Sequence, residues 1–589
     1  MSSVFLNKRY RDLIIFGSLF ILSLFLSYDI KFPQGKIRRA GEITGDMADY
    51  YVYLPATFIY HWDISKIPDS VEQRCHAFTL NRKTGKLIDK TTCGVAILWA
   101  PFFLAAHWIA LTWNLQSDGF SDLYQHMTVF PAVFYLVLGL FFLKKFLDHY
   151  FRRWIPYLTV LLVFAGTNLY FYAMDEGLMS HVNSFFLFST FLYLLKRFLD
   201  SEKKPFYLFV LMTFVVSLAV LIRPTNILLI LWMALLDVKT LKEAGNRILF
   251  FLRPKYIIGF LIIGFLVFLP QFFYWRYLTG HFVYYSYPGE TFSNWSNPRM
   301  ISFWFAPLNG LFIYSPLAIF FIVGIILMIV KKIPNGIFTG IIFLLVSYIF
   351  SSWYIWFFGG SCGCRPFVEY FSLMALPFGY FLNSISKLKN LFIRSVVVFM
   401  IFFMTYYNLK MDYKYNWNTS STWSWEDYYR HMDQAFFSFF ENRSYTYIDD
   451  FENARLGEDY FPEISRVHSP TVANYMDEGI EYSRKYVAVL NGVLSKPLEK
   501  IEASIWVNPG TNLKTGAVLM CSVQDWHKQY AYFGTIKFDT FTVRPDKWVE
   551  CKGTFSIPPW TDPTNILTIC VWNIKRSKFN IDDIKLKFE

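Results

Sequence analysis

The chain of 589 residues is 54% hydrophobic and 21% aromatic, and only 17% of its residues are charged. A soluble protein would carry about a quarter charged residues, so this composition excludes an ordinary soluble protein and indicates a polytopic membrane protein. The net charge of +12 does not require nucleic acid as a partner, because the basic residues lie largely in short runs between apolar segments.

Eleven apolar segments approach the length of about 20 residues that a membrane-spanning helix needs. They lie at 12–30, 127–145, 155–174, 181–198, 205–222, 224–237, 255–275, 311–330, 336–355, 367–385 and 391–408. The first segment lacks a small-residue cleavage site, so we expect a retained anchor rather than a signal peptide.

The basic loops predict the orientation of the chain. Runs of Lys and Arg at 144–153, 196–204, 239–255, 331–332 and 387–389 all fall on the side of the N-terminus. The positive-inside rule places this side in the cytoplasm, in a bacterial-type inner membrane, and the C-terminus in the periplasm or outside the cell.

The apolar segment 95–113 does not fit this alternation. If it spanned the membrane, the basic run at 144–153 would lie outside. We therefore expect an interfacial or re-entrant helix on the external face, with an additional span as the alternative.

The composition changes after Leu409, which predicts three parts: a membrane domain at 1–408, an interfacial linker helix at 409–444 and an all-β domain at 445–589. Alternating apolar and polar residues predict a β-sandwich or jelly roll. The strands are expected at 500–507, 517–523, 531–538, 548–555, 565–572 and 579–588.

The first external loop, at about 31–126, opens with an acidic and aromatic stretch. Asp46 and Asp49 lie three residues apart, followed by Tyr50 and Tyr53. No predicted span carries a file of acids or histidines through its middle, as a proton-coupled pump would. Further ionisable residues lie at the predicted external ends of helices, which favours a site at the membrane surface: Glu176, His181, Arg223, Arg365 and Glu369.

Four stretches together resemble the GT-C glycosyltransferases, such as the protein O-mannosyltransferases and the aminoarabinose transferase of lipid A. They are Gly45-Asp46 with Tyr50 to Ala56, Met179-Ser180-His181, Ile222-Arg223-Pro224-Thr225, and 353–366. The resemblance covers about 400 residues. It implies transfer of a sugar, with inversion, from a polyprenyl-phosphate carrier to a glycan, lipid or protein acceptor, without a catalytic cofactor.

The resemblance implies that a carboxylate in the first loop, Asp46 or Asp49, acts as the base. A positioned carboxylate contributes about 10²–10⁴-fold to such a reaction. The residues alone leave other interpretations open. Asp46 could cap a helix beginning at Met47, and Asp49 could be a solvated residue of the same helix.

Arginine suits the phosphate of the donor because its guanidinium is planar and always charged. We expect Arg223 and Arg365 to bind this phosphate; the alternative is that they extend to lipid head groups. His181 could instead be a hydrogen-bonded interface residue, and Glu369 could form an ion pair with Arg365. The candidate substrate-binding residues are Tyr50, Tyr53, Glu176, His181 and Glu369.

The C-terminal region resembles jelly-roll carbohydrate-binding modules in the stretches 447–452 and 579–584. Asp449, Glu452 and Asp582 are candidate ligands of a structural Ca²⁺, which prefers oxygen atoms; the alternative is that the Asp582 pair caps a strand turn. Four tryptophans could stack on sugar rings or belong to the core: Trp506, Trp526, Trp548 and Trp572.

The cysteines fit an exported face. Cys75 and Cys93 bracket a hydrophilic stretch of the first loop and are a candidate disulfide. Cys362 and Cys364 are expected to be unpaired and buried. Two other functions compete with the enzyme: a transporter or flippase of lipid-linked glycans, and a non-catalytic glycan-binding membrane protein.

Overall fold

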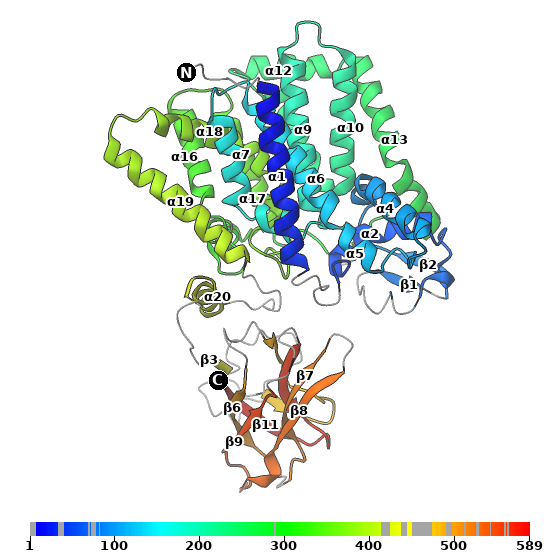
Figure 1. Ribbon diagram of the computed structural model, residues 1–589, viewed down its shortest axis with the longest axis vertical. Helices are drawn as coiled ribbons and strands as arrows, with labels where there is room; N and C mark the ends of the chain where they lie inside the picture. Colours follow the sequence, from blue (N-terminus) through cyan, green and yellow to red (C-terminus); the bar gives the residue numbers. More distant parts are fainter. Residues whose placement is uncertain are drawn as a thin grey trace. The chain divides into compact units, whose positions relative to one another are not determined.

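The structure is a computed structural model divided into two compact units, Met1–Tyr415 and Asn416–Glu589. The first unit is helical and the second consists mainly of strands (Figure 1). The structure describes residues 8–32, 41–68, 71, 78–81, 83–287, 290–413, 424–437, 445–449, 474–483, 485–490, 498–511, 514–525, 529–541, 544–558, 561 and 565–589.

Six helical segments in the described part of the chain are long and apolar enough to cross a membrane. They are α1 (Lys8–Lys31), α4 (Gly94–Thr112), α5 (Asp122–Met127) continued by α6 (Val129–Leu147), α9 (Ser180–Asp200), α13 (Pro254–Thr279) and α19 (Leu391–Tyr413). The shorter apolar helices are α7 (Ile155–Ala165), α10 (Phe206–Ile222), η3 (Pro224–Ile230) with α11 (Leu231–Leu235), α16 (Ala318–Val330) and α17 (Gly336–Ser351). A helical unit of membrane type is confirmed, whereas the number of eleven spans stays a prediction.

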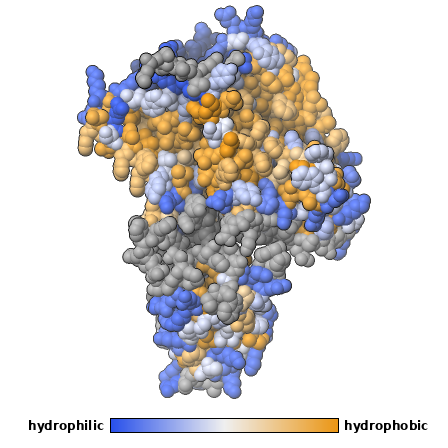
Figure 2. All heavy atoms as spheres, viewed as in Figure 1, coloured by the Kyte–Doolittle hydropathy of each residue, from blue (hydrophilic) through white to orange (hydrophobic). Residues whose placement is uncertain are grey.

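The helices pack as a bundle whose two ends differ. The pairs α6–α9, α9–α10 and α10–α13 lie side by side, and α1 packs on α6. One end carries α12 (Leu241–Phe251), and the other carries α2 (Gly45–Phe58) and the hairpin of β1 (Thr79–Asn81) and β2 (Lys86–Ile88) (Figure 1). Figure 2 shows a broad apolar surface over the helices between these ends.

Helix α4 packs on α2 and α5 and lies across the end of the bundle (Figure 1). Its outward side is apolar and exposed, and includes Ile97, Leu104, Trp108 and Leu111. This is the arrangement that an interfacial or re-entrant helix would have, and the depth of α4 in the membrane stays a prediction.

The predicted span at 155–174 is interrupted, because α7 ends at Ala165 and α8 (Leu169–Met174) follows. Gly166 packs closely against Leu317, so a Cβ there would require the leucine side chain to shift. The side chain of Asn168 then donates a hydrogen bond to the carbonyl of Cys362, at 3.0 Å. The predicted span at 367–385 likewise begins late, as α18 (Phe371–Ser386) after η4 (Arg365–Phe367). These breaks place irregular backbone at one end of the bundle.

The second unit contains two antiparallel sheets, ordered β5-β10-β7-β8 and β3-β11-β6-β9, with β4 paired to β11. Alternate residues of both sheets form one apolar core, including Ile501 and Ile505 of β6 and Leu567 and Ile569 of β10. All six predicted strands are present, with bounds within one residue of those predicted: β6 (Lys500–Asn508), β7 (Val518–Gln524), β8 (Tyr530–Lys537), β9 (Val549–Ser556), β10 (Ile566–Trp572) and β11 (Phe579–Phe588). Strands β3 (Tyr445–Asp449), β4 (Asn474–Met476) and β5 (Tyr486–Val489) were not expected, and helix α20 (Trp425–Phe437) lies in the predicted linker.

Of the three candidate calcium ligands, the structure describes the side chain of Asp582 alone. Asp449 ends β3, Glu452 lies outside the described residues, and buried Asp582 accepts a hydrogen bond from the backbone N–H of Asp583. No three His, Cys, Asp or Glu side chains within the described ranges are grouped to hold a metal ion. Asp582 lies within β11, at the β-bulge between Asp582 and Lys585, and not at a turn between strands, so the turn interpretation is wrong; calcium stays a prediction. Trp526 also lies outside the described residues.

Cys93 is a free, buried thiol, and its predicted partner Cys75 lies outside the described residues. The predicted disulfide is therefore not among the bonds of the described chain. Cys362 and Cys364 are free and buried, as predicted.

Candidate functional site

Asp46 lies in the first turn of α2 and contacts a loop far away in the sequence. Arg365 Nη1 donates a hydrogen bond to Asp46 Oδ2 at 3.2 Å, across a separation of 319 residues. The helix begins at Gly45 with Thr44 as its N-cap, so the interpretation of Asp46 as an N-cap is wrong. The Asp46 side chain is 43% exposed and that of Arg365 is 18% exposed, so a ligand can reach the carboxylate.

The start of α2 is held in place by Gln125 of α5. Gln125 Oε1 accepts hydrogen bonds from the backbone N–H groups of Glu42, at 2.7 Å, and Ile43, at 3.1 Å. A buried ion pair of 3.4 Å joins Glu42 to Lys31 at the end of α1. These contacts fix the position of Asp46 relative to two helices of the bundle.

The loop before Arg365 is equally constrained. Gly363 has φ +64°, a left-handed conformation that side chains with a Cβ rarely adopt, and a Cβ there would lie 2.7 Å from Tyr314 Cβ. The hydrogen bond from Asn168 to the carbonyl of Cys362 ties the same loop to the break between α7 and α8. Arg365 follows directly, at the start of η4.

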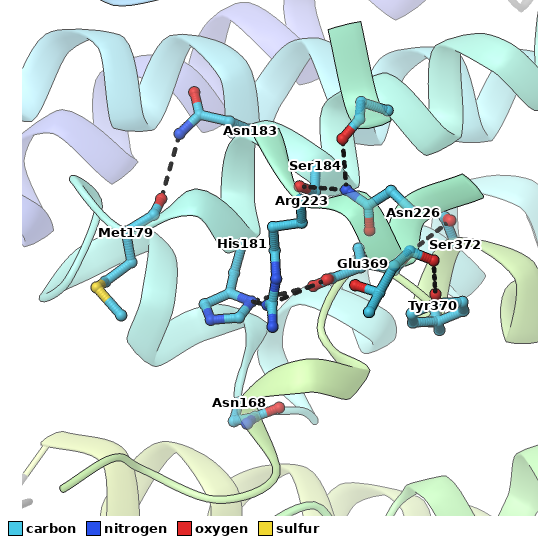
Figure 3. Close-up of polar contacts among 12 residues, drawn as sticks. Asn168, Met179, His181, Asn183, Ser184, Arg223, Asn226, Glu369, Tyr370 and Ser372 are labelled. Atoms are coloured by element: carbon cyan, nitrogen blue, oxygen red, sulfur yellow. Dashed lines mark hydrogen bonds and ion pairs between the residues drawn. The ribbon is translucent and has the colours of Figure 1, made fainter. Parts of the chain in front are cut away.

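Three further candidates meet at the same end of the bundle (Figure 3). His181 Nδ1 and Glu369 Oε2 are 3.0 Å apart, and Arg223 Nη1 lies 3.3 Å from Glu369 Oε1 and 3.1 Å from His181 Nδ1. Glu369 is fully buried, so the two neighbouring cationic or hydrogen-bonding groups compensate its charge. Glu369 therefore pairs with Arg223 and His181, and the alternative interpretation, an ion pair with Arg365, is wrong.

Neighbouring amide and hydroxyl groups support this cluster (Figure 3). Asn226 Nδ2 donates to Ser184 Oγ at 3.1 Å and to the carbonyl of Ala219 at 2.9 Å, which fastens the start of η3 to α9 and α10. Tyr370 Oη donates to the carbonyl of Thr225 at 3.3 Å. The segment after Arg223 and the segment after Glu369 are thereby joined.

Tyr50 interacts both with the Asp46–Arg365 pair and with Arg223 of the second cluster. It shares a hydrogen bond with Ser180 and interacts electrostatically with Arg223, Asp46 and Arg365, while burial raises the pKa of its hydroxyl. Buried Glu176 also acts electrostatically on Arg365.

Tyr53 does not join this site. Its hydroxyl donates to the carbonyl of Thr91 at 2.8 Å, in the connection before α4. The Tyr53 hydroxyl therefore makes a structural contact within the first loop.

The pKa values of Asp46 and Asp49, the two carboxylates of the first loop, are shifted in opposite directions. Burial alone would raise the pKa of Asp46, but the charges of Arg365 and Lys90 outweigh it and hold that pKa below its usual value. Asp49 is only 2% exposed, and burial, together with the charge of Asp46, raises its pKa to about 7. Its Oδ1 atom has no hydrogen-bond partner among the described residues. The pair therefore combines an ionised, accessible carboxylate with a buried one that titrates near neutrality.

The sequence interpretation missed Asp89 and Lys90. Asp89 accepts a hydrogen bond from the N–H of Thr91 at 2.8 Å, and burial, followed by the charge of Asp49, raises its pKa well above the usual range. Lys90 lies 3.5 Å from Glu290 and acts on both Asp46 and Asp49. The only sequence signal for them is a polar pair after a short strand, and nothing in the spacing links that pair to Asp46.

No protein-family model matches the chain, and neither a curated protein nor a solved structure is significantly similar to it. The functional argument therefore depends on the contacts of the site. These contacts bring together Asp46, Tyr50, His181, Arg223, Arg365 and Glu369 from α2, α9, the end of α10 and the segment between α17 and α18.

Proposed function

We propose that the protein is a membrane glycosyltransferase of the GT-C type. It would transfer a sugar, with inversion, from a polyprenyl-phosphate donor to a glycan, lipid or protein acceptor on the external face. The observation that carries the proposal is the contact between Asp46 and Arg365, which places an accessible carboxylate beside a cation suited to phosphate.

In this reaction an acceptor hydroxyl attacks the anomeric carbon while the bond from that carbon to the phosphate oxygen breaks. The hydroxyl proton passes to a carboxylate, and polyprenyl phosphate leaves. Asp46 is the better placed base, because it is ionised and 43% exposed, whereas Asp49 is almost fully buried. A base within hydrogen-bond reach of the acceptor supplies about 10²–10⁴-fold of the rate.

Arg365 and Arg223 would bind the phosphate. Within the described chain, the hydrogen bond of the Arg365 side chain goes to Asp46 through Nη1, so most of its five N–H groups remain for a ligand. Arg223 is held between His181 and Glu369 and is 17% exposed. Two guanidinium groups near one phosphate would stabilise the charge that grows on the leaving group.

Donor binding would also change the pKa of the base, Asp46. When a phosphate takes hydrogen bonds from Arg365, Asp46 loses part of the interaction that lowers its pKa. The negative charge of the phosphate raises that pKa further. Asp46 would then be a stronger base in the complex with donor than in the free protein, which favours ordered binding with the donor first.

The proposal places this end of the bundle in the periplasm or outside the cell, because the predicted basic runs lie at the opposite helix ends. The C-terminal sandwich would then be external, as a jelly-roll module for binding the acceptor glycan. A reporter fused after Glu589 should be active only outside the cytoplasm.

A transporter of lipid-linked glycans would need polar groups along a path through the bundle. The charged clusters of the helical unit lie instead near helix ends: Asp46 with Arg365 at one, and Asp12 with Lys144 at the other. This distribution favours the enzyme over the transporter.

Analysis of membrane lipids and glycans from a deletion strain would test the function. We expect an accumulated polyprenyl-phosphate sugar and an acceptor that lacks this sugar. Unchanged acceptors with an unchanged donor pool would refute the proposal. A lipid-linked glycan retained on the cytoplasmic side would support the transporter.

A further inference from the structure

A groove of about 660 Å³ lies between α1 and α6. Its lining is mostly apolar, with Leu13, Phe16, Gly17 and Phe20 from α1 and Phe134, Val137, Leu138 and Phe141 from α6. A Cβ at Gly17 would meet no atom within 4 Å, so the absence of a side chain there leaves open space. Asp12 and Lys145 are the charged residues of the lining.

The length of the groove matches one leaflet of a bilayer. The lining runs from Asp12 to Phe20 on α1 and from Phe134 to Lys145 on α6, or roughly 12 and 16 Å at 1.5 Å per residue. Half of the hydrocarbon core is about 15 Å thick. One acyl chain of a phospholipid reaches this far, whereas a polyprenyl chain is longer.

The charged end of the groove carries an excess of positive charge. Asp12 is shared by Lys144 and Lys145, each with Nζ 2.7 Å from a carboxylate oxygen, and Lys144 also lies 2.9 Å from Asp148. Arg11 is exposed beside them, so three cations face two carboxylates. The side chain of Lys145 is 25% exposed and can reach a head group.

We propose that this groove binds an acyl chain of an anionic phospholipid, with the phosphate near Lys145, the cation of its lining. The groove lies toward the start of α1, far from the end where Lys31 and Asp46 lie, so the lipid is not the sugar donor. By the positive-inside rule it comes from the cytoplasmic leaflet.

Bound lipid would add contacts to a helix that has few. Only 17% of the spanning window of α1 is buried. The floor of the groove is formed where Phe16 and Phe141 pack edge to face, with ring centroids 5.5 Å apart. An acyl chain lying over Gly17 would extend this contact between α1 and α6.

The test uses the purified, delipidated full-length protein in detergent. Native mass spectrometry counts the lipids bound after addition of dioleoyl phosphatidylglycerol, dioleoyl phosphatidylcholine or undecaprenyl phosphate. We expect an about five-fold preference for the anionic phospholipid for each basic side chain engaged. Lys145→Gln should reduce this preference.

Gly17→Leu should remove one bound phosphatidylglycerol by filling the groove, and leucine favours the helix over glycine, so folding is not threatened. Gly245→Leu is the matched control in α12, because a Cβ there also meets no atom within 4 Å and Gly245 does not line the groove. Equal binding by the two variants would overturn the proposal. So would equal binding of the two phospholipids, or displacement of phosphatidylglycerol by undecaprenyl phosphate.

Discussion

Replacing Asp49 by asparagine should stabilise the protein, and more so at higher pH. Burial and the neighbouring charge of Asp46 raise the pKa of Asp49 to about 7 from its ordinary value of 3.8. The folded protein therefore holds a proton that the unfolded chain loses above pH 4. Stability falls as the pH rises from about 4 to 7 and then levels off. Asparagine keeps the shape of the side chain and removes this cost.

The shift of about 3 pKa units corresponds to about 4 kcal/mol at pH 8, at 1.36 kcal/mol per unit. At pH 5 the linkage leaves a gain of about 2 kcal/mol, because this pH lies only about 1 unit above the ordinary pKa of 3.8, at which the unfolded chain begins to lose the proton. For a unit of this size the melting temperature changes by roughly 1–2 °C per kcal/mol. Asp49→Asn should thus melt about 4–8 °C above the wild type at pH 8 and about half as far above it at pH 5.

Thermal unfolding in detergent at both pH values measures this effect. Asp46→Asn is the matched control. It loses the ion pair with Arg365, and because burial is the larger cause of the raised Asp49 pKa, removing the charge of Asp46 relieves only the smaller part of the cost, so its gain should be smaller than that of Asp49→Asn. If Asp49→Asn is no more stable than the wild type at pH 8, or if its gain does not shrink at pH 5, the burial argument is refuted.

Three other predictions concern the supports of the site. Arg365→Lys should weaken donor binding and slow turnover in a titration with lipid-linked donor, since the charge remains but the planar fork does not; wild-type binding would contradict the role in phosphate recognition. Gly363→Ala should lower the melting temperature more than Gly359→Ala. Both have positive φ, costing about 1–2 kcal/mol, but only the Cβ at Gly363 would collide with Tyr314. Gln125→Leu should destabilise the protein by about 1–3 kcal/mol, because two backbone N–H groups lose their acceptor; an unchanged melting temperature would show that these bonds are dispensable.

The strands of the sandwich were predictable because their alternation is strong. In β6, Ile501, Ala503, Ile505 and Val507 point into the core while the residues between them are only partly buried, so the period of two is visible in the sequence. Strands β3 and β4 are short, and both are paired with β11. Such pairing depends on the sheet as a whole and leaves little periodic signal.

The lengths of the apolar segments predicted a helical unit of membrane type, but they did not predict where the helices are interrupted. Gly166, the C-cap residue of α7, packs closely against Leu317, a contact between segments distant in sequence. A hydropathy pattern records the composition of 155–174 and contains no information on that contact.

The residues of the site could be predicted from the sequence, but the hydrogen bonds and ion pairs between them could not. Asp46 was predicted from the acidic stretch of the first loop and Arg365 from the end of a predicted span, both within the stretches that carry the resemblance, and the fold brings them to 3.2 Å. The sequence allowed an ion pair between Glu369 and Arg365, one helical turn away, but in the bundle Glu369 contacts His181 and Arg223 instead. Asp89 could not be found from the sequence, since its relation to Asp49 arises only when the segment after β2 packs beside α2.

Transfer by the purified protein in nanodiscs tests the central claim most directly. The assay supplies candidate polyprenyl-phosphate sugars and acceptors and measures the release of polyprenyl phosphate by the wild type, Asp46→Asn and Asp49→Asn. The account predicts turnover by the wild type, none by Asp46→Asn despite retained donor binding, and a smaller loss in Asp49→Asn. Full activity in Asp46→Asn would contradict the role of Asp46 as the base.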